Sequence, residues 1–110
     1  MSETYKREIV QRINKGLLDI QLLRMIKSQP LWGYRIKKKA KDELNIKLRH
    51  SALYPTLNLL EKKGYLKSER QQEMGRPRKI YSITEKGENY LKTYYNILEE
   101  QLRDKDIEKF

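Results

Sequence analysis

The chain has 110 residues, of which 25 are Lys or Arg and 15 are Asp or Glu, so its formal net charge is +10. This length suits one domain that folds with little stability margin. With no cysteine and one histidine, His50, the composition excludes disulfides, thiolate metal sites and histidine zinc sites. No apolar run approaches the roughly 20 residues of a membrane span. We expect no cofactor and no membrane partner, and the absence of catalytic motifs argues against an enzyme.

The positive charge is unevenly distributed along the chain. Residues 1–83 hold 20 basic and 8 acidic side chains, whereas residues 84–110 hold 5 basic and 7 acidic ones. Such a cationic excess indicates a polyanionic partner, for which nucleic acid is the leading candidate. An ordinary solvated, lysine-rich surface is the alternative.

Two helices are predicted at the start of the chain. Residues 4–14 are polar, with Tyr5, Ile9 and Ile13 at a spacing of four that is typical of a helix with a narrow apolar stripe. Residues 16–28 form the most apolar stretch, which predicts a core helix buried on more than one side. It should end before Pro30.

A short, basic helix is predicted between Gly33 and Asn45. Asn45 suits a helix end because asparagine tolerates the left-handed backbone conformation. The side chains expected to face the core are Tyr34, Ile36, Ala40 and Leu44. Residues 46–48 should then form an extended connector.

The next helix is predicted over residues 51–63, before Gly64, with Leu53, Leu57 and Leu60 as its inner face. After Gly64 the pattern changes. Residues 65–70 and 79–83 have strand character, and residues 71–78 are rich in charge and turn formers. We expect a β-hairpin with a long basic loop.

A last helix should begin after Thr84, because threonine is a good N-cap residue and the acidic residues that follow favour a helix N-terminus. Its apolar side chains recur at steps of four, three and four, which is typical of a coiled-coil seam. The residues of this predicted dimer interface are Leu91, Tyr95, Leu98 and Leu102. Residues 104–110 are expected to fray.

The predicted order of three helices, strand, basic loop and strand is that of a winged helix-turn-helix, here mainly α with a small β-hairpin and added N-terminal and C-terminal helices. In this arrangement the third helix enters the DNA major groove and the loop reaches the backbone or minor groove. The candidate DNA-binding residues are Arg49, His50, Ser51, Tyr54, Asn58, Arg76, Arg78 and Lys79. Ser51 is also a candidate helix cap. Packing against the preceding helix is the alternative for Tyr54, and a solvated turn is the alternative for the loop.

Several motifs carry a family resemblance. The segments Pro30-Leu31-Trp32-Gly33-Tyr34, Leu53-Tyr54-Pro55-Thr56-Leu57 and Leu60-Glu61-Lys62-Lys63-Gly64-Tyr65-Leu66 resemble the PadR family of transcriptional regulators, and residues 75–87 extend the match. The resemblance runs from about Leu17 to Leu91. The chain departs from the family pattern at Arg49, where Ser or Thr is common, and at Met74-Gly75, where the wing usually has two glycines.

The resemblance implies a bacterial or archaeal, cytoplasmic repressor that binds a pseudo-palindromic operator in double-stranded DNA as a homodimer. Residues 1–83 would form the DNA-binding part and residues 84–110 the dimerisation helix of one compact unit. In some members a small aromatic ligand relieves repression, and here Trp32 and Tyr94 are the candidate ligand residues. Aromatic residues such as the tyrosines of the last helix belong more often to a dimer core than to a ligand pocket.

Two other functions remain open. A nonspecific architectural nucleic-acid-binding protein would share the charge but would not discriminate between DNA sequences. A protein-interaction adaptor would bind a protein partner and no DNA.

Overall fold

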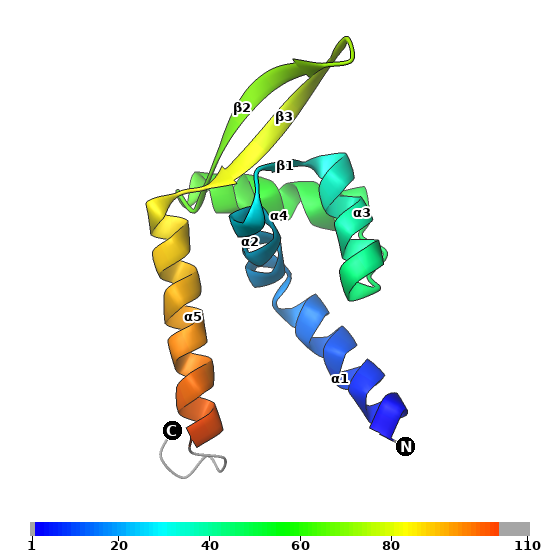
Figure 1. Cartoon of the computed structure of the whole chain (residues 1–110), viewed down its shortest axis with the longest axis vertical. Helices are drawn as coiled ribbons and strands as arrows, with labels where there is room; N and C mark the ends of the chain where they lie inside the picture. Colours follow the sequence, from blue (N-terminus) through cyan, green and yellow to red (C-terminus); the bar gives the residue numbers. More distant parts are fainter. Residues whose placement is uncertain (1, 104–110) are drawn as a thin grey trace.

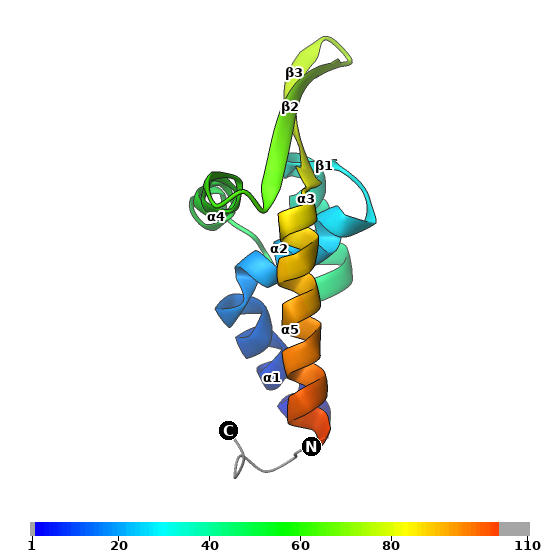
Figure 2. The same ribbon diagram turned by 90° about the vertical axis from the view of Figure 1, so that its left-hand side faces the viewer.

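The structure, a computed structural model, describes residues 2–103 and confirms a mainly helical winged fold with a small antiparallel sheet (Figure 1). The hairpin projects from one end of the molecule, and the helices at the two ends of the chain point the opposite way (Figures 1 and 2). In chain order the elements are α1 (Ser2–Gly16), α2 (Leu18–Ser28), β1 (Leu31–Trp32), α3 (Gly33–Leu44), α4 (His50–Lys62), β2 (Leu66–Glu73), β3 (Arg76–Ile83) and α5 (Glu85–Arg103).

One hydrophobic core joins α2, α3, α4, the base of the sheet and the start of α5. The predicted inner face of α4 is confirmed, because Leu53, Leu57 and Leu60 are all buried. The helix α2 is the centre of this core, and most of its side chains are inaccessible to solvent. Helical periodicity therefore identified the inner face of α4 correctly.

The sheet has three antiparallel strands in the order β1-β3-β2. The two-residue strand β1 was not predicted, and it pairs Leu31 with Tyr81 and Trp32 with Ile80. The strands β2 and β3 pair continuously from Leu66 with Ile83 out to residues 73 and 76. The prediction of a long loop over residues 71–78 is therefore wrong.

A two-residue turn, Met74-Gly75, closes this hairpin. Both residues have positive φ, 53° and 78° respectively. Two consecutive residues of this kind match the type I′ turn, which preserves the right-handed twist of paired strands. Near the turn Gln71 and Gln72, on opposite faces of β2, are both exposed, as are Arg76 and Pro77 on β3, so this part of the hairpin lacks the alternating pattern from which its length could have been predicted.

Two local predictions about the helices are corrected. Tyr34 was expected to face the core but is 63% exposed, whereas Ile36 and Ala40 are buried as predicted. The helix α4 begins one residue before Ser51, with Arg49 in the N-cap position and no side-chain capping hydrogen bond. The predicted stop at Asn45 is confirmed by its left-handed conformation, φ 53° and ψ 39°.

The junction between the sheet and α5 is tightly built. The Thr84 hydroxyl accepts a hydrogen bond from the Gly87 backbone N–H at 3.0 Å, which confirms the predicted N-cap. The same hydroxyl donates to the Gly64 carbonyl oxygen at 2.6 Å, so it links the end of α4 to the start of α5. Gly87 packs against the Tyr65 carbonyl, where a larger side chain has no room.

Beyond this junction, α5 and α1 carry apolar side chains on exposed faces. On α5, Tyr95 is 37%, Leu98 37% and Leu102 74% exposed. Leu91, predicted with them as an interface residue, is instead completely buried and packs in the core of the chain itself. The exposed apolar residues of α1 are Tyr5, Ile9, Val10 and Ile13. The predicted frayed tail, residues 104–110, lies outside the described residues.

Candidate nucleic-acid interface

The first turns of α4 present a polar, exposed surface. Arg49, His50, Ser51 and Asn58 are all exposed, and Ser51 and Asn58 lie on the side of the helix opposite its buried leucines. Side chains on the outer face of such a helix can reach base edges in the major groove. The positions predicted from the sequence are therefore accessible.

Tyr54 combines packing with partial exposure. Its ring stacks on His50, with the ring centroids 5.1 Å apart and an interplanar angle of 14°. The other neighbour is Gly33 at the start of α3, where a side chain of any size would overlap the Tyr54 ring. Tyr54 thus packs against the start of α3, as the alternative interpretation of this residue proposed. Its ring also lines a hollow between α4 and the wing, the hairpin of β2 and β3.

The wing carries its arginines Arg76 and Arg78 on strand β3. Arg76, next to the turn, is exposed. Arg78 is half-buried, and its guanidinium carbon lies 5.2 Å from the centre of the Trp32 ring. Arg35 approaches the same ring at 6.0 Å. A cation over an aromatic face is held electrostatically, so Trp32 orients both arginines, and Arg78 is the one of the two that lines the hollow.

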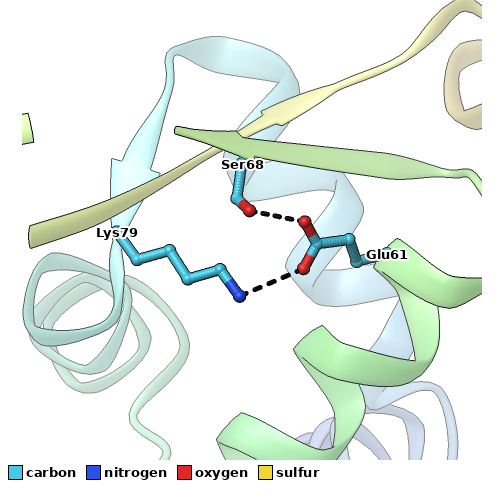
Figure 3. A network of polar contacts seen from close by, with 3 residues as sticks. All are labelled: Glu61, Ser68 and Lys79. Atoms are coloured by element: carbon cyan, nitrogen blue, oxygen red, sulfur yellow. Dashed lines mark hydrogen bonds and ion pairs between the residues drawn. The ribbon is translucent and has the colours of Figure 1, made fainter. Parts of the chain in front are cut away.

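Lys79 has a different environment from the arginines beside it. Its ammonium group lies 3.3 Å from a carboxylate oxygen of Glu61, in the last turns of α4. The other carboxylate oxygen accepts a 2.5 Å hydrogen bond from the Ser68 hydroxyl on β2 (Figure 3). The Ser68 hydrogen bond, together with Lys79, lowers the pKa of Glu61. The hydrogen bond to Glu61 raises the pKa of Lys79, so both groups of the pair remain charged at neutral pH.

Sequence reasoning did not identify Glu61 or Ser68 as part of this surface. The two residues are seven positions apart on different elements, and no local pattern links them. It also gave no role to the basic residues of α3. Lys38 and Lys41 are exposed, and Lys37 is half-buried. These cations add positive charge to α3, whose first turn borders the hollow through Gly33 and Tyr34.

The structure does not bring the two candidate ligand residues together. Trp32 lines the hollow beside the wing, with Tyr54, Arg78 and Lys79. Tyr94 lines a separate hollow between α2 and α5, with Leu17 and Tyr90. These are two distinct surfaces, and only the first adjoins the basic hairpin.

Within residues 2–103 no cluster of three or more His, Asp or Glu side chains has the arrangement of a metal site. No helix in that range is long and apolar enough to cross a membrane. The basic, aromatic and hydroxyl side chains of α4 and the wing suit the phosphates and base edges of a nucleic acid.

The three-helix core with its exposed α4 and basic hairpin defines a winged helix-turn-helix protein. Residues 22–93 match the model of the transcriptional regulator PadR-like family. The chain thus belongs to the PadR-like family of transcriptional regulators, which are not enzymes. The comparison with curated protein sequences gives no match.

Solved structures similar to this chain include a transcriptional regulator from Clostridium thermocellum, with 26% identity and a TM-score of 0.72 over 87% of this chain and 98% of that one. A PadR family regulator from Eggerthella lenta has 25% identity and a TM-score of 0.71 over 99% and 97%. Bacillus subtilis PadR, solved with operator DNA, has 27% identity and a TM-score of 0.66 over 72% of this chain and 45% of that longer chain.

Proposed function

We propose that this regulator is a homodimeric repressor that binds a specific, pseudo-palindromic operator in double-stranded DNA. The observation that carries the proposal is that the exposed polar side of α4 and the arginine-bearing strand β3 of the wing border one hollow, which Asn58 and Arg78 both line. Residues from α4 would contact base edges, and Arg76 and Arg78 would contact the phosphates or minor groove. The operator complex of Bacillus subtilis PadR supports the choice of DNA as the partner.

The exposed apolar faces of α1 and α5 support a second copy of the chain as the other partner. Apolar side chains repeated along one helix face favour burial against another helix. Both helices point away from the wing (Figure 1), so a dimer formed there would leave the two basic surfaces free. Two such surfaces would engage half-sites about one helical turn apart.

We also propose that a small aromatic effector binds beside Tyr94. The hollow there is about 410 Å³ and is mainly apolar, with Ile20, Tyr90 and Ile97 in its lining. An aromatic ring would be well matched to these side chains. Calorimetric titration with aromatic compounds tests this part, and a Tyr94→Ala variant should lose the binding.

As a regulator of this kind, the protein would act in the prokaryotic cytoplasm.

The test of the main proposal is selection of genomic fragments bound by the purified protein, followed by footprinting. We expect a discrete protected palindrome and an affinity for it at least about 10³-fold above that for random DNA at physiological salt. Equal affinity and uniform protection would instead indicate an architectural DNA-binding protein. Binding of a protein partner with no DNA shift would indicate an adaptor. Activation of a reporter gene, in place of repression, would contradict the repressor role and leave the proposal of specific DNA binding intact.

A further inference from the structure

The wing loses its support from the rest of the sheet at one position. Strand β1 pairs with β3 only at Tyr81 and Ile80. From Lys79 outward, β3 is paired with β2 alone. An isolated two-stranded hairpin is a weakly stable and pliable structure. Contacts at this position therefore determine how firmly the wing is held.

One carboxylate holds both strands at that position. Ser68 lies opposite Tyr81 in the sheet, and Lys79 lies two residues from Tyr81, so the side chains of Ser68 and Lys79 share one face. Glu61 reaches this face from α4 and contacts both of them, one with each carboxylate oxygen (Figure 3). We refer to Glu61, Ser68 and Lys79 as the wing clamp.

We propose that Glu61 is a positioning residue that fixes the angle between the wing and α4, and that Lys79 acts through this clamp instead of contacting DNA. The DNA-binding consequence of this inference rests on the proposed function, whereas its consequence for the free protein does not. The surface assigned to direct contact then consists of the α4 residues and the wing arginines.

The length of the hairpin makes this angle important. Met74 at the tip is six residue steps along the chain from Ser68, which corresponds to about 20 Å at about 3.4 Å per residue. A rotation of about 10° at the clamp would therefore move the tip by about 3.5 Å, several times the tolerance of a hydrogen bond. Arginines near the tip can match phosphate positions only if that rotation is restricted.

For removal of Glu61, the clamp predicts a change in DNA affinity opposite in sign to the change that simple electrostatics predicts. Glu61 carries a negative charge within a basic surface, and removal of a negative charge should strengthen binding to a polyanion. Removal of the clamp should weaken binding because the wing loses its fixed orientation. The sign of the change in affinity therefore distinguishes the two effects.

The first experiment measures affinity for the selected operator. Glu61→Ala should weaken binding by about three- to ten-fold, as expected for the loss of one pair and a charge-assisted hydrogen bond. Glu61→Gln keeps an acceptor for Ser68 and should fall between Glu61→Ala and the parent protein. Glu69→Gln, an exposed residue of the same hairpin, is the matched charge control and should bind as well as the parent or better.

Two variants of Lys79 test its part in the clamp. Lys79→Ala should weaken binding without changing the salt dependence, because no phosphate contact is lost. The double variant Glu61→Lys, Lys79→Glu keeps the net charge and can form the ion pair in reverse. It should therefore bind the operator more tightly than either Glu61→Ala or Lys79→Ala, and less tightly than the parent protein. A salt slope lowered by about one in Lys79→Ala would show a phosphate contact and overturn the assignment of Lys79.

The second experiment measures the wing in the free protein. Since the chain has no cysteine, Leu59→Cys on α4 and Met74→Cys at the tip allow a pair of spin labels to be attached. Both positions are exposed, at 48% and 97%. Double electron–electron resonance on labelled protein diluted with unlabelled protein should give a narrow distribution of distances between the two labels. Glu61→Ala should broaden this distribution while the circular dichroism spectrum stays unchanged.

The outcomes separate the two proposals. An unchanged distance distribution in Glu61→Ala, or an affinity equal to or above that of the parent, overturns the clamp. If the parent protein discriminates no DNA sequence, the proposed function fails, and the distance measurement alone decides whether Glu61 positions the wing.

Discussion

Gly87 is the point at which α5 touches the base of the wing, and Gly87→Ala tests how closely these parts are packed. A β-carbon built at this position overlaps the Tyr65 carbonyl oxygen and approaches the Ile83 side chain at 2.8 Å. The carbonyl belongs to the backbone and accepts a hydrogen bond from the Thr84 N–H at 3.1 Å. It cannot move without disturbing the junction.

Two opposing effects set the magnitude of this change. Alanine stabilises a helical position relative to glycine by about 1 kcal/mol. Overpacking against a rigid neighbour costs about 3 kcal/mol. The net loss is about 2 kcal/mol in the free energy of unfolding, which for a domain of this size corresponds to a fall in Tm of roughly 8–16 °C.

Urea and thermal denaturation at one fixed protein concentration provide the measurement, because association with a second copy would make Tm depend on concentration. Gly16→Ala is the matched control, since a β-carbon there meets nothing within 4 Å. It should leave stability unchanged or raise it by up to about 1 kcal/mol. If Gly87→Ala and Gly16→Ala have the same stability, the packing explanation of the junction is refuted.

Three further predictions concern binding, assembly and pH. Arg78→Ala should weaken binding to all DNA sequences and lower the salt slope by about one; an unchanged slope would remove Arg78 from the phosphate contacts. Leu98→Glu should convert the proposed dimer to a monomer in sedimentation, because it places a charge on the exposed face of α5; a persistent dimer would exclude this face. The hydrogen bond from the Ser68 hydroxyl, and after it Lys79, lowers the pKa of Glu61 below its ordinary value of 4.5. The stability that the clamp adds is therefore fully present above pH 4.5 and is lost as the pH falls through the lower pKa of Glu61 in the folded protein. The difference in unfolding free energy between the parent and Glu61→Gln should thus be constant from about pH 6 to 8 and shrink in acid; a constant difference down to acid pH would contradict the clamp.

Much of the helical part could be predicted because its signals are local. Leucines three and four residues apart identify the inner face of α4 whatever lies against it. Asn45 and Thr84 mark helix ends through their own backbone preference or side-chain hydrogen bonding. The family motifs then identified the wing between α4 and α5.

The hairpin shows where local signals fail. Its outer residues Gln71, Gln72, Arg76 and Pro77 are all solvent-exposed, so no alternation distinguishes strand from loop there. The turn at Met74-Gly75 was also difficult to anticipate, because methionine seldom adopts positive φ. The two residues of β1 are too few for any periodic pattern, and they become a strand only because β3 lies beside them.

The sequence by itself determined the basic character of the chain, the order of its helices and its family, because each depends on composition, short-range spacing or motif. Tertiary structure alone decided that Leu91 belongs to the core while Leu98 is exposed, since both occupy the same helical seam. It also decided that Glu61 joins Ser68 and Lys79 in the wing clamp. These contacts join separate elements, and their geometry exists only after the chain has folded.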